Sequence, residues 1–292
     1  MYILIPVVIS LLLPTFSPNV RAAVEFSQTL YGCKGGFGSL PASSLYAIDP
    51  ATGSATLIGS MVNVVGCSGL RFQPSTGALY AVGLDVLTGI VSLFTVNVQT
   101  GLATLIGHSS HTCPGTGVSN ARIADIGFRS DGMLFGSLTA SSVTNTCLGT
   151  LSTTTGAVTF IGQTGDGSAG NGLAFDSKGK LWLATSGHLD TLNQATAAAT
   201  FVAPLVGCGV MNALAFDLSN TLYASLSCGN GGFGPNFLAT IDTATGAVHT
   251  IGLTVNGLDG IAFSNPPQTH TRTFEAYRDA PRSIFVDSKE SP

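Results

Sequence analysis

Small polar residues recur along the chain at one fixed distance before a phenylalanine. The repeated phenylalanines are Phe72, Phe128, Phe175, Phe216 and Phe263. The residues four places before them are Ser68, Ala124, Asn171, Asn212 and Asp259, and Asp125 follows Ala124. Carboxylate, amide and hydroxyl oxygens are the ligands that a hard cation such as Ca²⁺ takes from a protein. The candidate metal ligands are therefore Asn171, Asn212, Asp259, Asp125 and Ser68.

The same residues have a structural alternative, because Asn and Asp side chains also hydrogen-bond the backbone of nearby turns. On that interpretation they cap the turn before each repeat and bind nothing. No HExxH, CxxC or GxSxG motif occurs elsewhere, so the sequence offers no zinc, dithiol or serine-hydrolase signature. The single tryptophan, Trp182, occupies a repeat position held elsewhere by Tyr or Phe. It is predicted to be core.

Two alternating motifs must position these residues. The first contains a Thr-Gly turn and ends in Ile-Gly, as in LYAIDPATGSATLIG at 45–59, LFTVNVQTGLATLIG at 93–107, LGTLSTTTGAVTFIG at 148–162 and LATIDTATGAVHTIG at 238–252. The second contains the repeated phenylalanine, as in GLRFQPSTGALYAVG at 69–83 and GLAFDSKGKLWLAT at 172–185. The phenylalanines lie 41 to 56 residues apart. Four-stranded antiparallel units at such intervals are typical of propeller blades.

The sequence thus predicts an all-β fold, a β-propeller of about five four-stranded blades. Segment 30–49 resembles 222–242, whereas 258–265 holds only a first strand. We therefore expect N- and C-terminal strands to share one blade and close the ring, which removes exposed sheet edges. The expected organisation is a signal peptide over 1–22, the propeller over 23–265 and a polar, flexible tail over 266–292.

Composition and the N-terminus restrict the class of protein. The net charge is −4 and only 9% of residues are charged, with no run of Lys or Arg, so a nucleic-acid partner is not expected. The stretch from Tyr2 to Leu13 is almost wholly apolar, and Ala22 offers a cleavage site, a pattern typical of a signal peptide. It is too short to span a membrane. We expect a secreted monomer, extracellular or periplasmic, with no transmembrane segment in the mature chain.

Six cysteines, an even number without CxxC spacing, indicate three disulfides in an exported chain. In a propeller blade, the segment before the first strand and the segment between the second and third strands lie at the same face. This topology predicts the pairs Cys113–Cys147, Cys208–Cys228 and Cys33–Cys67, all at one face. Six cysteines allow 15 connectivities, so the pairing is a hypothesis.

The repeats, most clearly GLAFDSKGKLWLAT and LYAIDPATGSATLIG, resemble those of extracellular bacterial β-propellers of the YVTN and NHL types. Asn171-Gly172-Leu173 and Asp259-Gly260-Ile261 also resemble the metal-binding segments of SMP-30-like lactonases. That family has six blades and a glutamate ligand, and no Glu occurs here between Glu25 and the tail. The resemblance implies the fold, while propellers serve as hydrolases, lectins and scaffolds alike.

The function expected first is that of a secreted, non-enzymatic propeller whose loops bind protein or carbohydrate at the disulfide-bearing face. Phe37, Phe233 and Phe237 are the candidate contact residues on those loops, since aromatic side chains add apolar area at low entropic cost. One alternative is a lactonase-like, metal-dependent hydrolase with an ion at the channel mouth, and calcium is the one cofactor suggested. Another is a structural module of the cell envelope.

Overall fold

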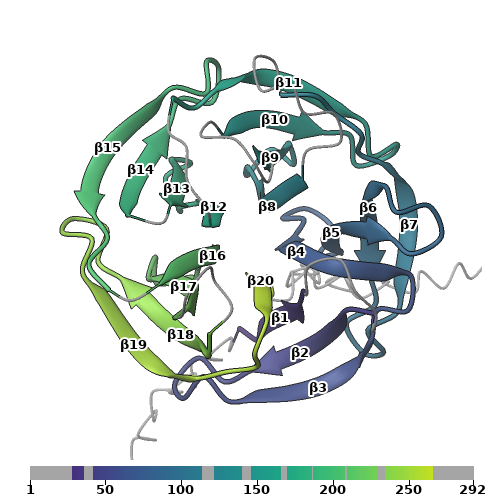
Figure 1. The fold of residues 1–292 in the computed structure, drawn as a ribbon, viewed down its shortest axis with the longest axis horizontal. Coiled ribbons are helices and arrows are strands. Elements are labelled where there is room, and N and C mark those ends of the chain that lie inside the picture. The colour runs from purple at the N-terminus through teal and green to yellow at the C-terminus, as the bar shows by residue number, and fades with distance from the viewer. Residues whose placement is uncertain are drawn as a thin grey trace, which may run out of the picture.

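The computed structural model describes residues 28–35, 42–113, 122–139, 146–165, 170–185, 187–207, 209–228 and 234–265. These residues form five four-stranded antiparallel sheets arranged around a central axis, with no helix among them (Figure 1). The prediction of a five-bladed all-β propeller is confirmed. The predicted signal peptide at 1–22 and tail at 266–292 lie outside the described residues.

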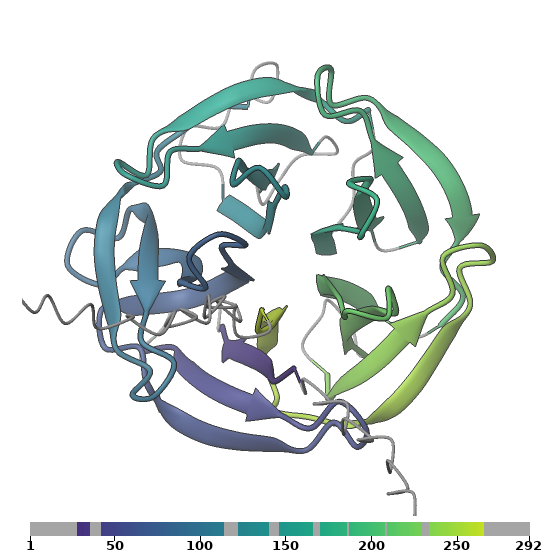
Figure 2. The same cartoon turned by 180° about the vertical axis from the view of Figure 1, so that it is seen from behind.

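Each blade contributes one strand at each of four distances from the axis (Figure 2). The innermost strands are β20 (Leu258–Phe263), β4 (Val64–Phe72), β8 (Arg122–Phe128), β12 (Gly170–Phe175) and β16 (Val210–Phe216). The second strands are β1 (Leu30–Lys34), β5 (Leu79–Asp85), β9 (Leu134–Thr139), β13 (Leu181–Thr185) and β17 (Leu222–Ser227). The third strands are β2 (Ser44–Ile48), β6 (Val91–Val96), β10 (Cys147–Leu151), β14 (His188–Leu192) and β18 (Asn236–Ile241). The outermost strands are β3 (Ala55–Ser60), β7 (Ala103–His108), β11 (Val158–Gln163), β15 (Ala199–Pro204) and β19 (Val248–Leu253).

The core lies between neighbouring blades, because both faces of each inner sheet are covered. In β5 all residues but one are buried, whereas the outermost strand β3 has no buried residue. Continuous apolar runs such as LYAV therefore occupy the inner strands, and threonine alternates with apolar residues outside. This difference is expected, because the inner strands are covered on both faces whereas the outermost strands are partly exposed to solvent.

Aromatic pairs join every blade to the next and explain the repeated phenylalanine. In each pair, an aromatic residue of a second strand contacts the phenylalanine that ends the next blade's inner strand. The pairs are Tyr31–Phe72, Tyr80–Phe128, Phe135–Phe175, Trp182–Phe216 and Tyr223–Phe263, with ring centroids 5.0 to 6.3 Å apart. Trp182 is buried and its indole N–H donates to Asp176 at 3.1 Å. Its predicted role in the core is confirmed.

A second ring of contacts, near the rim, explains the Thr-Gly and Ile-Gly motifs. The glycine that follows the isoleucine of an outermost strand packs against the Thr-Gly turn of the next blade, as Gly59 packs on Gly101. A β-carbon on Gly101 would lie 2.8 Å from the carbonyl carbon of Gly59. Gly101 also has a φ of 77°, a conformation that disfavours L side chains. The repeat therefore keeps glycine at both positions for close packing between blades.

The chain closes the ring as predicted, by pairing β1 with β20. The antiparallel register aligns Leu30 with Phe263. Beside it, the side-chain amide of Gln28 donates to the Ser264 carbonyl at 2.9 Å, and its oxygen accepts from the backbone N–H of Leu218 at 2.7 Å. Gln28, the first described residue, is thus hydrogen-bonded to two other parts of the chain.

Two disulfides, Cys33–Cys67 and Cys113–Cys147, have the predicted pairing. Cys33 and Cys67 lie inside β1 and β4, not in connecting loops as expected. Those strands run further toward the face where inner strands begin, which we call the disulfide face. Cys228 is also disulfide-bonded, and its predicted partner Cys208 lies outside the described residues. Such bonds indicate an oxidising compartment. The described part of the chain has no helix long and apolar enough to cross a membrane.

We predict that Gly101→Ala destabilises the fold more than Gly77→Ala. Both glycines have positive φ, so each alanine carries a backbone penalty of roughly 1–2 kcal/mol. A β-carbon at Gly77 meets nothing within 4 Å, whereas one at Gly101 collides with Gly59, which adds roughly 1–3 kcal/mol. Urea unfolding of both variants measures the difference. Equal losses would show that the rim contact between blades contributes nothing.

Candidate functional site at the channel mouth

The inner strands approach one another so closely at the axis that small residues are needed there. Three places before each repeated phenylalanine stand Gly69, Asp125, Gly172, Ala213 and Gly260, and one place before it stand Arg71, Gly127, Ala174, Ala215 and Ala262. A β-carbon on Gly172 would lie 2.8 Å from the carbonyl carbon of Ala213 in the next blade. Asp125 at the first of these positions and Arg71 at the second are therefore the two large exceptions among residues otherwise kept small.

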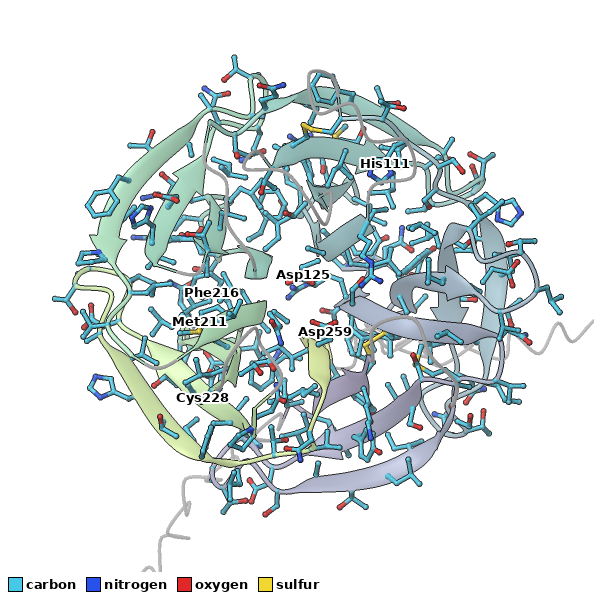
Figure 3. The ribbon with its side chains drawn as sticks, in the orientation of Figure 1. His111, Asp125, Met211, Phe216, Cys228 and Asp259 are labelled. Atoms are coloured by element: carbon cyan, nitrogen blue, oxygen red, sulfur yellow. A yellow bond between two sulfur atoms is a disulfide. The ribbon has the colours of Figure 1, made fainter. Side chains whose placement is uncertain are left out.

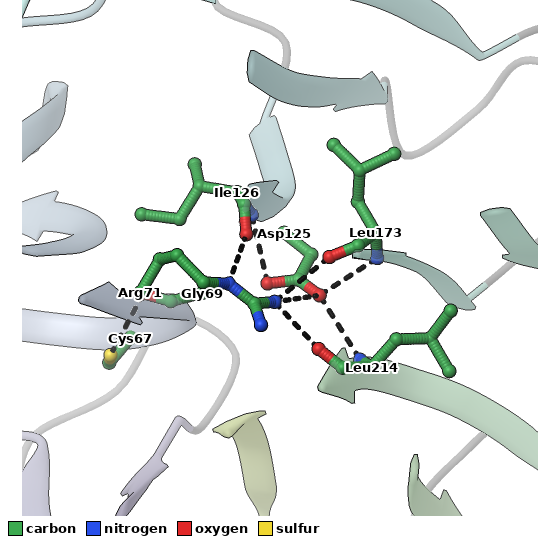
Figure 4. A network of polar contacts seen from close by, with 7 residues as sticks. All are labelled: Cys67, Gly69, Arg71, Asp125, Ile126, Leu173 and Leu214. Atoms are coloured by element: carbon green, nitrogen blue, oxygen red, sulfur yellow. Dashed lines mark hydrogen bonds and ion pairs between the residues drawn. The ribbon is translucent and has the colours of Figure 1, made fainter. Parts of the chain in front are cut away.

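Arg71 crosses the channel and binds three other blades (Figure 4). Its Nε donates to the Ile126 carbonyl at 3.0 Å. Its Nη2 donates to the Leu173 carbonyl at 2.9 Å and to the Leu214 carbonyl at 2.6 Å. One guanidinium from β4 thus links β8, β12 and β16 across the axis.

Asp125 makes the complementary set of contacts from β8. Its Oδ1 accepts the N–H of Ile126 at 2.8 Å, and its Oδ2 accepts the N–H groups of Leu173 at 2.8 Å and Leu214 at 3.2 Å. The Nη2 of Arg71 lies 3.8 Å from the same Oδ2. The backbone N–H and C=O groups of Leu173 and Leu214 are therefore satisfied by this one pair of side chains, as buried polar groups must be.

Burial governs the electrostatics of this pair. Asp125 is fully buried and the Arg71 side chain is 13% exposed. Desolvation raises the pKa of Asp125 to about 7, against the opposing effects of Arg71 and of three backbone hydrogen bonds. Desolvation also lowers the pKa of Arg71, which Asp125 partly offsets. Burying these two charged side chains at the centre of the channel costs desolvation energy. Their hydrogen bonds to backbone groups and the attraction between their opposite charges offset that cost.

Sequence reasoning identified Asp125 but missed Arg71. The signal was present in the repeat alignment, because the residue before the phenylalanine is Gly or Ala in every other copy. A single arginine at a position otherwise kept small indicates a side chain that must occupy the axis itself.

The predicted polar set lies on a β-bulge that recurs in all five inner strands. The pairing between first and second strands skips Ala124, Asn171, Asn212 and Asp259, and in β4 it skips the stretch that contains Ser68. Bulges change the direction of a side chain and are common next to functional sites. The fixed spacing found in the sequence is thus the spacing of this bulge from the end of the strand.

The bulge brings these residues to the mouth of the channel at the disulfide face. Ser68, Ala124, Asn212 and Asp259 are partly exposed, while the residues on either side of each are buried. Asn171 holds the equivalent backbone position, and its side chain is outside the described part. The Ser68 hydroxyl donates to the Ile123 carbonyl at 2.6 Å, a structural role in the next blade. Figure 3 places Asp259 and Asp125 together near the centre of the ring.

Asp259 is the most perturbed acid at the mouth. Burial and the nearby charge of Asp125 together raise its pKa to about 8, against the opposing effect of Arg122. Burial in turn lowers the pKa of Arg122, which Asp259 opposes. Two acids and two arginines, Asp125, Asp259, Arg71 and Arg122, therefore share this end of the channel.

The metal interpretation finds limited support in this arrangement. The described residues contain no group of three or more His, Cys, Asp or Glu side chains able to hold a metal ion. Both oxygens of Asp125 already accept backbone hydrogen bonds. Of the remaining candidate ligands, Asp259 lies within electrostatic reach of the positive charge of Arg122.

Of the three aromatic contact residues, Phe37 and Phe233 lie outside the described residues. Phe237 lies in β18, not in a loop, and packs partly buried against the core cluster around Met211 and Leu226. The strand begins at Asn236 because Asn236 pairs with Ser227. Phe237 therefore contributes to the packing of its blade.

Comparison with known proteins shows the fold alone. No protein-family model and no curated protein matches the sequence. A protein of unknown function from Bacteroides caccae is 13% identical, covers 82% of this chain and 99% of its own, and has a TM-score of 0.51. A candidate 6-phosphogluconolactonase from Bacteroides fragilis (11% identity, 84% and 99% coverage, TM-score 0.45) and a gluconolactonase from Xanthomonas campestris (12%, 77% and 76%, 0.44) are also similar. Proteins this distant share a propeller architecture, which does not imply a shared activity.

Removing Arg71 is expected to destabilise the whole propeller. Arg71→Met leaves Asp125 buried without its counter-charge, and such changes cost roughly 3–5 kcal/mol. Arg129→Met, which removes the exposed ion pair with Asp131, should cost a small fraction of that. Adding Asp125→Asn to Arg71→Met should recover part of the loss. Chemical denaturation measures all four proteins, and equal effects of the two arginine changes would contradict a central role for Arg71.

The pH dependence of stability should carry the signature of Asp259. Its folded pKa of about 8 lies above the ordinary value of 3.8, so the folded state binds the proton more tightly, and that stabilisation is lost as pH rises toward 8. Asp259→Asn cannot ionise and should gain stability relative to the parent as pH rises from about 4 to about 8, with no further gain above that. Asp242→Asn is the control, because backbone hydrogen bonds lower the pKa of Asp242 and its trend has the opposite sign. A flat difference for Asp259→Asn would show that its carboxyl is not desolvated.

Proposed function

We propose that this protein is an exported, non-enzymatic β-propeller that presents its disulfide face for binding protein or carbohydrate. The observation that carries the proposal is the filling of the channel by Arg71. Its guanidinium binds carbonyls of three blades at the axis, where a metal-dependent propeller hydrolase would need an ion. The channel therefore has a structural role, in which Arg71 holds the blades together. A ligand would then bind at the surface around the channel mouth.

The donor set fits a catalytic cation poorly. Ca²⁺ takes 6–8 oxygen ligands, while the Asp125 oxygens and the Ser68 hydroxyl are engaged by other blades. A cation would also meet the positive charges of Arg71 and Arg122. These groups favour a binding role over the lactonase-like alternative.

The disulfides support a binding role for this face. Cys33–Cys67 joins two blades, and Cys113–Cys147 joins two segments of one blade, both at the disulfide face. The sequence near these cysteines varies between blades, in contrast to the repeated motifs. Anchored segments lose less conformational entropy when they bind a partner. The same bonds support export, in line with the signal-like N-terminus.

Metal analysis of the mature protein, with thermal unfolding in calcium and in EDTA, tests this proposal. We expect no stoichiometric metal, no shift in Tm in either condition and no hydrolysis of lactones or esters. Glycan arrays and pull-downs should then yield a ligand for the native protein. Bound metal that is lost in Asp259→Ala, together with lactone hydrolysis, would replace the proposal with the hydrolase alternative. A structural envelope module would show no ligand in either assay.

A further inference from the structure

Two polar side chains of the bulge ring at the channel mouth have no hydrogen-bond partner among the described residues. Neither the Asn212 amide nor the Asp259 carboxyl hydrogen-bonds to another described residue. By contrast, Ser68 on the same ring and Asp125 just below it are both hydrogen-bonded. Asn212 and Asp259 are both partly exposed, so solvent reaches them. Asn212 and Asp259 are therefore available to a ligand, from the adjacent inner strands β16 and β20.

The charges at the mouth restrict what that ligand can be. Arg71 and Arg122 disfavour a cation, and Asp125 and Asp259 disfavour an anion. The Asp259 carboxyl accepts hydrogen bonds, the Arg122 guanidinium donates them, and the Asn212 amide does both. A site of this kind suits a neutral ligand whose groups are themselves both donors and acceptors, and the hydroxyl group is the common example.

We infer that the channel mouth binds a small neutral polyhydroxylated ligand, a saccharide or polyol, through Asp259, Asn212 and Arg122. This inference rests on the proposed binding function and gives it a site and a ligand class. Arg122 begins β8 and lies within electrostatic reach of Asp259, where its guanidinium can donate to a hydroxyl oxygen. Three inner strands of different blades thus contribute one group each.

Two features limit the size of the ligand. Arg71 blocks the channel below the mouth, so a chain cannot thread through. The repeated phenylalanines lie at the other ends of the inner strands and pack between blades, so none of them offers a ring for a sugar to stack on. Hydrogen bonds then carry the binding, which favours one sugar unit at weak affinity.

Isothermal titration of the full disulfide-bonded chain tests the inference with glucose, galactose, mannose and sorbitol as probes. Gluconate and calcium chloride are the charged comparisons. We expect at least one neutral probe to bind, and Asp259→Ala and Asn212→Ala each to weaken it at least about tenfold, the loss typical of one hydrogen bond to a buried polar group. The matched controls are Asp131→Ala and Asn97→Ala, in turns of the opposite face, and both should bind within about twofold of the parent. Thermal unfolding confirms that all variants fold.

The inference is overturned if no neutral probe binds, if the mouth variants bind as well as the controls, or if gluconate or calcium binds more tightly. Glycan or protein binding that survives Asp259→Ala would leave the proposed function in place and remove only this site. Hydrolysis of a lactone that is lost in Asp259→Ala would overturn the proposed function, and this inference with it.

Discussion

The close approach of five inner strands at the axis is the constraint on which the rest of this propeller depends. It reserves the axial positions for glycine and alanine, as Gly172 and Ala213 illustrate. It also brings backbone carbonyls and N–H groups of different blades so near that one side chain can reach several of them. Arg71 and Asp125 use this geometry. The energetic cost of burying two charges is offset because each satisfies groups that would otherwise be unpaired in a water-poor channel.

Further from the axis, the blades are joined by two rings of contacts that differ in chemistry. The aromatic ring buries large apolar area, whereas the rim ring depends on glycines that allow backbone to touch backbone. In both rings a residue of one blade meets a residue of the next. A fifth, degenerate copy of the first motif, LDTLNQATAAATFVA at 189–203, has alanine where the others have glycine. In this copy Ala197 keeps a positive φ of 68°. The position therefore retains its shape even where the favoured residue is lost.

The repeats make most of the fold predictable, because residues that contact the next blade must recur at the same place in every copy. That is why the strand order, the closure of the ring and the disulfides Cys33–Cys67 and Cys113–Cys147 could be inferred. The fixed spacing of the polar set reflects a bulge shared by the inner strands. The bulge was not foreseen, since it leaves no distinct residue type in the sequence. Arg71 was missed because its partners are backbone atoms of three blades, and backbone partners leave no trace in a repeat pattern. Phe237 was assigned to a loop because the start of a strand is set by pairing with a partner strand.

Ring closure by β1 and β20 has a consequence for the order of events in the cell. The first blade lacks its inner strand until residues 258–263 have been synthesised, and Arg71 cannot complete its contacts before β12 and β16 exist. A growing chain is therefore an open arc with an unpaired edge at β1 and an axis that is not yet assembled. Closure of the ring must therefore wait until nearly the whole propeller has been synthesised.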